Sequence, residues 1–426
     1  MIEKTLVADG FSFPTSICFD PSGNAYVAES GLPWDGAPAG GRVYAILPDG
    51  GKKLLAEGLR QPVNGLCWYH GALIVSEGGY PGRISRLTTD GERTDILDGL
   101  PGMGNYHTNM VTPGPDGKLY FGQGALTNLS VIGMDAYQLG WLGHLPHNCD
   151  VPGYPVVLTG QTFETRDPFS FNSDAKSYTG AFSEFGKWHQ PGTHIPAGLP
   201  CTAAIMRCNP DGSDLELVAW GIRNAFGLGF LPDGRLIATD QGSDDRGSRP
   251  IGHVPELMFE IKQGAWYGWP DFIGGVPVTD AQFKPTRGEQ PEFVLTNHNE
   301  LPPPEKPLIS LPANTAATKF DMLPLSAPSY PGQIIITLFG DEKPMTAPPG
   351  FKAGRNISRI DPADWSHHPY PDMGFNRPID VKYNPADDCI WIVDFGIFEM
   401  SNKGVEAAKE SGKIWKIKTT DLFQYN

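Results

Sequence analysis

A repeated strand–turn–strand unit is the feature that most constrains the fold. Its clearest copy spans residues 220–247. Phenylalanine and leucine alternate with glycine at 226–230, which is typical of a short strand packed on both faces. A Pro-Asp-Gly turn follows at 232–234, and an apolar run at 236–238 forms a second strand. The segment therefore predicts a hairpin whose open end carries polar residues.

The same unit recurs along the chain, and its period indicates the architecture. Further strand pairs with their own turns lie between the copies, so two pairs together form a four-stranded sheet. Such sheets at a period of roughly 40–50 residues are typical of a β-propeller. We expect an all-β, six-bladed β-propeller in which residues 1–426 form a single domain. The expected blades are approximately residues 1–50, 51–100, 101–124, 201–250, 255–345 and 354–417.

Two stretches interrupt this period. Residues 125–200 and 271–312 are rich in turn-forming residues and show little periodicity. Because insertions this long are often functional, we expect them on the rim face, over the inter-strand loops. The strand-like segments 5–7 and 414–417 are predicted to pair in one blade, which would close the ring and remove its exposed edges.

Composition narrows the classes of partner and compartment. The formal net charge of -15 argues against a nucleic-acid partner, which would favour a basic surface. No apolar run approaches the roughly 20 residues of a membrane span. No signal peptide is visible, so we expect a cytoplasmic protein unless the N-terminus has been trimmed. The six cysteines do not cluster and are interpreted as structural thiols, with a disulfide in an insertion as the alternative.

Polar residues at strand ends are the candidates for chemistry. His107 opens the third repeat, where it would face the central channel as a general base; a structural histidine beside a turn is the alternative. Arg223 and Asn224 suit a carboxylate or a quinone oxygen. The alternative for Arg223 is hydrogen bonding to strand-end carbonyls at the blade junction.

Carboxylates near glycine-rich backbone offer a candidate calcium site, with solvated loop charge as the alternative. The carboxylates in question are Asp240, Asp244, Asp245 and Glu256. Glu29 and Glu77 end equivalent strands and are predicted either to point into the channel or to form salt bridges with Arg42 or Arg83. The chain has no Gly-x-Ser-x-Gly, P-loop or Gly-x-Gly-x-x-Gly motif after a strand, so serine hydrolase, NTPase and nicotinamide functions lack support.

Three motifs resemble the glucose/sorbosone dehydrogenase family. They are Gly-Ile-Arg-Asn-Ala-Phe-Gly at 221–227, Asp-Gln-Gly at 240–242 and Gly-Ala-Trp-Tyr-Gly-Trp-Pro at 264–270. The resemblance covers most of the propeller from His107 onward. It implies a six-bladed propeller that oxidises a sugar or aldose with pyrroloquinoline quinone (PQQ) and Ca²⁺, and an external electron acceptor.

The resemblance also implies roles for individual residues. His107 is similar to the family's base, which takes a proton from the sugar C1 hydroxyl as hydride goes to the quinone. Arg223 and Asn224 resemble ligands of the cofactor oxygens. Gln241, with the carbonyls of Gly242 and Ser243, resembles the loop that holds the cofactor and its calcium, to which Asp240 and Glu256 add candidate metal ligands.

At the carboxylate-binding end of the cofactor, the chain differs from its best-known relatives. Arg377 resembles the first of two arginines in an Arg-x-Arg-Asp-Val motif, but Ile379 stands in place of the second. Tyr106 stands where an acid usually precedes the base. The family's lysine in the fifth blade has no clear counterpart, although Lys343 is close in sequence.

Two other functions remain open at this stage. A calcium-dependent propeller hydrolase, such as a lactonase, would use Glu29, Glu77, Asn109 and Asp240 around a central metal. A non-catalytic propeller would instead bind carbohydrate on the aromatic residues of the first insertion, which otherwise pack that insertion onto the propeller. These aromatics are Tyr137, Trp141, Tyr178, Phe182, Phe185 and Trp188.

Overall fold

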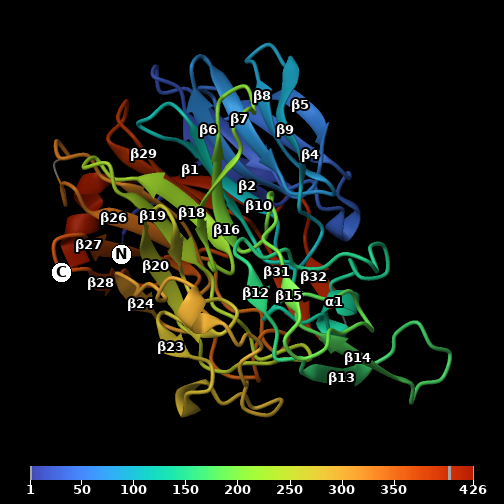
Figure 1. Ribbon diagram of the computed structural model, residues 1–426. Helices are drawn as coiled ribbons and strands as arrows, with labels where there is room; N and C mark the ends of the chain where they lie inside the picture. The colour runs from blue at the N-terminus through green and yellow to red at the C-terminus, as the bar shows by residue number, and fades with distance from the viewer. Residues whose placement is uncertain (1, 328, 402–403, 426) are drawn as a thin grey trace.

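The computed structural model describes residues 2–327, 329–401 and 404–425, and it has the expected all-β, six-bladed propeller fold (Figure 1). Six sheets follow one another along the chain, each with four antiparallel strands. The first strand of each blade contacts the first strands of its two neighbours, so that six inner strands surround the central axis. These inner strands are β2, β6, β10, β18, β25 and β29.

The strands of the first three blades are bounded as follows. Blade 1 contains β2 (Pro14–Phe19), β3 (Ala25–Glu29), β4 (Gly41–Ile46) and β5 (Lys52–Leu59). Blade 2 contains β6 (Val63–Tyr69), β7 (Ala72–Glu77), β8 (Gly82–Leu87) and β9 (Arg93–Leu100). Blade 3 contains β10 (Thr108–Pro113), β11 (Leu119–Gln123), β16 (Ala204–Cys208) and β17 (Glu216–Trp220), and a short parallel strand, β21 (Ala265–Trp266), adds to its edge.

The remaining blades complete the ring. Blade 4 contains β18 (Ala225–Phe230), β19 (Leu236–Asp240), β20 (Glu256–Ile261) and β24 (Ile309–Leu311). Blade 5 contains β25 (Ala317–Met322), β26 (Ile334–Leu338), β27 (Asn356–Asp361) and β28 (Ser366–Pro369). Blade 6 contains β29 (Pro378–Asn384), β30 (Cys389–Asp394), β33 (Gly412–Lys418) and β1 (Thr5–Phe11).

Blade 6 joins the two ends of the chain as predicted. Thr5 pairs with Lys416 and Leu6 with Trp415 in an antiparallel ladder. The N-terminal strand is therefore the outermost strand of a sheet that the C-terminal part of the chain builds. This pairing closes the ring and holds the first blade against the last.

The observed blade limits correct the expected ones. The strand expected near 204–207 to belong to the fourth blade instead pairs with β11 in blade 3. The first insertion therefore lies within blade 3, between its second and third strands. Similarly, β24 lies inside the range 271–312 but pairs with β20, so the second insertion ends before this strand. The reason is that the chain can leave a sheet, form a long insertion and return to the same edge of that sheet. The spacing of repeats along the sequence does not reveal such a return.

The two insertions pack against each other. The first contains α1 (Met134–Gln138), β12 (Val156–Val157), β13 (Thr162–Arg166), β14 (Lys176–Gly180) and β15 (His194–Ile195). The second contains β22 (Phe272–Ile273), β23 (Val276–Pro277), η2 (Ala281–Phe283) and η3 (His298–Glu300). A bridge between Leu158 and Leu295 joins them, and both lie in the lower part of Figure 1.

The other short elements lie at the rim or the C-terminus: η1 (Trp34–Gly36), β31 (Phe398–Ser401), β32 (Gly404–Ala407) and η4 (Thr419–Tyr425). All six cysteines are free thiols, which agrees with the prediction that they are structural thiols. Among the described residues, no helix is long and apolar enough to cross a membrane.

Strand-end carboxylates have a shared structural role. Each closes the second strand of a blade and accepts a backbone N–H from the segment that enters the first strand. Glu29 accepts from Ser12 at 2.7 Å, and Glu77 accepts from Arg60 at 2.6 Å. Asp240 accepts from Asn224 at 2.8 Å. Buried N–H groups need such partners, so these carboxylates fix the rim segments that carry the candidate site.

Candidate active site

A cavity of about 820 Å³ lies where the entering segments of the inner strands converge. This volume is within the usual range of ligand pockets, about 300–1,000 Å³. One part of its lining is polar and carries His107, Asn224 and Gln241 from blades 3 and 4. Another part is apolar and comes mainly from blades 1, 5 and 6. Trp141 of the first insertion completes the lining.

His107 is held in one tautomer at the polar wall. Its Nδ1 lies 3.0 Å from the carbonyl oxygen of Gly78, which can only accept a hydrogen bond. Nδ1 therefore carries the proton, and Nε2 presents a lone pair. Burial lowers the pKa of His107 to about 4, so the ring is neutral at pH 7.

Two glycines allow this placement of His107. A Cβ on Gly78 would lie 2.5 Å from the Cβ of His107, and a Cβ on Gly124 would lie 2.8 Å from Oδ1 of Asn224. Gly124 also donates its N–H to the backbone oxygen of His107 at 2.9 Å. The absence of side chains thus permits the close approach of blades 2, 3 and 4 around the histidine.

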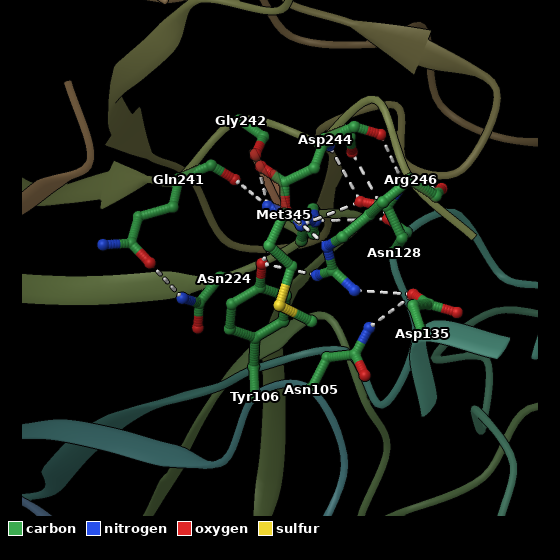
Figure 2. Close-up of polar contacts among 12 residues, drawn as sticks. Asn105, Tyr106, Asn128, Asp135, Asn224, Gln241, Gly242, Asp244, Arg246 and Met345 are labelled. Atoms are coloured by element: carbon green, nitrogen blue, oxygen red, sulfur yellow. Dashed lines mark hydrogen bonds and ion pairs between the residues drawn. The ribbon is translucent and has the colours of Figure 1, made fainter. Parts of the chain in front are cut away.

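A row of four side-chain amides crosses the cavity floor from blade 2 to blade 4. Asn64 donates to Asn109 at 3.4 Å, and Asn109 donates to Asn224 at 2.7 Å. Asn224 in turn donates to Oε1 of Gln241 at 2.7 Å (Figure 2). Nε2 of Gln241 has no partner among the described residues, so the row ends in a free donor that lines the cavity.

Arg223 lies beside this row, but its donors are committed to the protein. Nε and one Nη donate to the backbone and side-chain oxygens of Asn128 at 3.1 and 2.9 Å. The other Nη donates to the backbone oxygens of Gln241, at 2.9 Å, and of Gly242. A salt bridge of 2.8 Å to Asp244 uses the fifth N–H. The guanidinium therefore secures the 241–244 loop, which was the structural alternative for this residue.

A buried charge network continues from the Arg223–Asp244 pair through Arg246 to Asp135. Figure 2 shows Asp244, Arg246 and Asp135 of this network. Arg246 donates to Asp244 at 2.9 Å and to Asp135 at 2.5 Å. The ring of Tyr106 lies over the Arg223 guanidinium, 4.4 Å from ring centre to Cζ, and its hydroxyl accepts from Arg246 at 3.3 Å. Tyr106 thus contributes a neutral ring and hydroxyl to this network, and burial raises its pKa to about 12.

Arg377 does not reach the cavity. It is 1% exposed and donates to the carbonyls of Phe398 at 3.0 Å and Asp341 at 2.7 Å. A salt bridge of 2.9 Å to Glu399 completes its contacts. Ile379 lines the cavity instead, next to the apolar cluster that includes Phe339 and Phe398. The first arginine of the motif is therefore structural here, and the second position is an apolar wall.

Three of the four predicted metal ligands, Asp240, Gly242 and Glu256, accept hydrogen bonds from the protein at the predicted ligand atoms. Asp240 bonds the Asn224 N–H and does not line the cavity, and the carbonyl of Gly242 accepts from Arg223. Ser243 was predicted to bind through its carbonyl, and its hydroxyl donates to Asn128 O at 3.3 Å. Within the described ranges, no group of three or more His, Cys, Asp or Glu side chains could hold a metal ion. Calcium stays a prediction.

Glu256 lines the cavity and forms no salt bridge with the described residues. One of its oxygens accepts from the N–H groups of Gly242 at 3.2 Å and Ala317 at 3.3 Å. Burial raises its pKa to about 8, so the carboxyl holds its proton at neutral pH. A bound cation would reverse that preference by favouring the carboxylate.

Replacing Glu256 with Gln is expected to prevent the decrease in unfolding free energy that the wild type shows at alkaline pH. Because the folded protein holds this proton more tightly than the unfolded chain, the raised pKa adds to the free energy of unfolding. This contribution is complete below the ordinary pKa of 4.5 and is lost as pH rises through about 8. At pH 9 the variant should exceed the wild type by a few kcal/mol in unfolding free energy, on the order of 3, and match it near pH 5. Denaturant unfolding at both pH values measures this. Glu289→Gln, at an exposed glutamate, is the matched control, and equal pH dependence in all three proteins would contradict the expectation.

The other predicted candidates separate into different roles. Glu77 pairs with Arg83 at 2.6 Å, which was its structural alternative, and neither Glu29 nor Glu77 lines the cavity. In the first insertion, Phe182 packs against Trp220 and Trp269 in the core. Trp141 is 2% exposed and donates to Asn105 at 2.9 Å. Of the six aromatics predicted to bind carbohydrate, Tyr137, Tyr178 and Trp188 are exposed.

Three parts of the site were missed from the sequence. Asn64 was not recognised as part of the cavity, although it occupies the repeat unit of blade 2 as Asn109 occupies that of blade 3. The carbonyl of Gly78 carries no side-chain signal. The aromatic wall, formed by Trp34, Phe226, Phe339, Phe395 and Phe398, comes from four blades and has no local pattern.

Comparison with known proteins places these features in context. No protein-family model matches the chain. Quinoprotein glucose dehydrogenase B of Acinetobacter calcoaceticus is 26% identical over 184 residues, which are 42% of this chain and 29% of that protein. The match thus spans less than a third of the relative's length.

Solved structures match over nearly the whole chain. The PQQ-bound aldose sugar dehydrogenase of Streptomyces coelicolor has a TM-score of 0.57 and 16% identity, with 98% of both chains covered. The holo PQQ domain of pyranose dehydrogenase from Coprinopsis cinerea also has a TM-score of 0.57, with 13% identity and coverage of 98% of this chain and 97% of that one. These comparisons confirm the resemblance to the glucose/sorbosone dehydrogenase family and show that the chain shares the six-bladed fold of quinoprotein sugar dehydrogenases.

Proposed function

We propose that the chain is an oxidoreductase that dehydrogenates a hydroxyl group of a sugar or aldose in the central cavity. The observation that carries this proposal is the state of His107. Its Nδ1–H is fixed on the Gly78 carbonyl, and its depressed pKa keeps Nε2 unprotonated at neutral pH. A general base must present such a lone pair to the proton that it removes. The quinoprotein relatives support the class of reaction.

Different residues of the cavity have different roles in this reaction. Nε2 of His107 accepts the proton of the substrate hydroxyl as the carbon–hydrogen bond breaks and the carbonyl forms. A two-electron oxidant of the quinone class, held by the floor amides and the aromatic wall, would supply the acceptor for the hydride, and an external acceptor would then remove these electrons. The floor amides orient substrate and oxidant, since Gln241 Nε2 is free to donate to a carbonyl oxygen. The apolar wall excludes water from the reacting atoms.

The residues fit a quinone ring but not the three carboxylates of PQQ. The floor offers a neutral donor, and the aromatic wall offers faces on which a ring stacks. Carboxylates require free cations. Arg223 has no free N–H, Arg377 lies behind Phe339 and Phe398, and Nζ of Lys343 donates to Phe351 O at 2.9 Å outside the cavity. No step is therefore assigned to PQQ itself.

An oxidation assay tests the proposal directly. The purified protein would be mixed with a quinone, an artificial electron acceptor dye and a panel of aldoses, and dye reduction would be followed. We expect reduction that depends on protein, quinone and sugar. PQQ with Ca²⁺ and an uncharged naphthoquinone should be supplied in separate reactions. Failure of every sugar to reduce dye with either quinone would reject the oxidoreductase.

A further inference from the structure

In the described cavity lining, every permanently charged cation is paired with an acidic side chain. Among the described lining residues the permanently charged cations are Arg60 and Arg223. Arg60 forms a two-pronged contact with Asp98 at 2.6 and 3.0 Å and donates to Pro81 O at 3.0 Å. All five N–H groups of Arg223 donate to Asn128 or to the 241–244 loop. His107 is neutral. Arg60 keeps two N–H groups without a partner among the described residues, but its charge is already paired with Asp98.

The same cavity carries several acids. The acidic lining residues are Asp244, Glu256, Asp341 and Glu342. Any of these side chains that is ionised would repel a tricarboxylate, because like charges repel strongly where water is excluded. None of them offers such a ligand the positive charge that it requires.

The wall at Ile379 is apolar and closely packed. Ile379 is 5% exposed and belongs to the cluster that contains Phe339, Phe395 and Phe398. Trp34 lies 4.8 Å from Phe398, ring centre to ring centre, and also faces the cavity. A wall of this composition suits the face of a ring and leaves no partner for a charge.

We propose that the oxidant bound in this cavity is a quinone without carboxylates, a simple benzo- or naphthoquinone ring, rather than PQQ. The ring stacks on the aromatic wall beside Ile379, and one carbonyl accepts a hydrogen bond from Nε2 of Gln241. During turnover the quinone gains the hydride and one proton and becomes the hydroquinone, while the substrate C–OH becomes C=O. This assignment rests on the proposed function, which supplies the redox role of the ligand.

Comparing the binding of an uncharged quinone and of PQQ to the wild-type protein tests this assignment. Trp34 and Trp141 line the cavity, so quenching of tryptophan fluorescence reports occupancy. Menadione, an uncharged naphthoquinone, should quench saturably and bind at least about tenfold more tightly than PQQ. The titrations run with and without added Ca²⁺, which gives PQQ its most favourable condition. Tighter or equal binding of PQQ, or saturable binding of neither compound, overturns the proposal.

An arginine at position 379 should reverse the preference. Ile379→Arg restores the second cation of the motif, and we expect it to raise PQQ affinity at least about tenfold in a salt-sensitive manner and to weaken menadione binding. Ile397→Arg is the matched control, because Ile397 is 50% exposed in the same part of the chain and lies outside the cavity. Unchanged PQQ binding in a folded Ile379→Arg protein contradicts the proposal.

The binding and oxidation experiments fail in different ways. Menadione binding without sugar-dependent dye reduction would preserve the ligand assignment and reject the oxidoreductase. Dye reduction supported by PQQ alone would preserve the oxidoreductase and reject the uncharged quinone. If Ile379→Arg does not fold, the wild-type comparison of PQQ with menadione still decides the ligand class.

Discussion

Replacing His107 with Asn is expected to lower kcat for sugar oxidation by about 10²–10⁴-fold. The Asn side chain can still donate to the Gly78 carbonyl, but it offers no base where Nε2 stood. Binding of substrate and quinone should change little, because the floor amides and the aromatic wall remain. Steady-state dye reduction measures kcat, and fluorescence titration measures quinone binding in the same variant.

The pH profile separates a catalytic histidine from a structural one. With a pKa of about 4, His107 stays neutral as pH falls through 6.5, the usual value for histidine. Activity that depends on it should therefore persist to about pH 5 and fall only near pH 4. His253→Asn is a suitable control, since His253 is exposed and its backbone φ of 57° is one that Asn adopts readily. Equal activity in His107→Asn and the wild type would remove His107 from the mechanism.

Replacing Arg223 with Met is expected to reduce the unfolding free energy by about 3–5 kcal/mol. The change removes five hydrogen bonds from a guanidinium that is 2% exposed, and it leaves the carbonyls of Gln241 and Gly242 without their donor. It also leaves Asp244 with Arg246 as its remaining cationic partner. Denaturant unfolding measures the loss.

The control for this stability effect is Arg235→Met. Arg235 forms an exposed pair with Asp233 at 2.8 Å, and such pairs contribute about 0–1 kcal/mol. If Arg223 were chiefly a ligand for a cofactor, Arg223→Met would unfold like this control and would lose ligand affinity instead. A loss below 1 kcal/mol would therefore contradict the structural role.

Much of the architecture could be predicted because propeller blades are local. A hairpin such as 225–240 brings together residues that are close in sequence, and its alternating apolar residues and Pro-Asp-Gly turn are visible in one short window. The pairing of 5–7 with 414–417 was also predictable, since an open ring would expose strand edges. The limits of blades 3 and 4 were not, because each insertion separates strands of one sheet. The expected limits also assigned β5, β27 and β28 to the blade after the one in which they pair.

The candidate site was predicted in part for the same reason. His107, Asn224 and Gln241 lie at strand ends, and strand ends of a propeller meet at the rim. Hydrogen-bond partners cannot be read this way. Arg223 could have faced a ligand, and only the approach of Asn128, 95 positions earlier in the chain, shows that its donors are occupied.

The sequence by itself determined the six-bladed ring and the location of a polar rim, because both follow from a period within 40–50 residues. The tertiary structure decided what this rim can bind. It joined Asn64, Asn109, Asn224 and Gln241 into one row and placed Arg377 behind an aromatic wall. The physical reason is that burial and hydrogen bonding commit a side chain to partners from distant blades, and a committed cation cannot also bind a ligand.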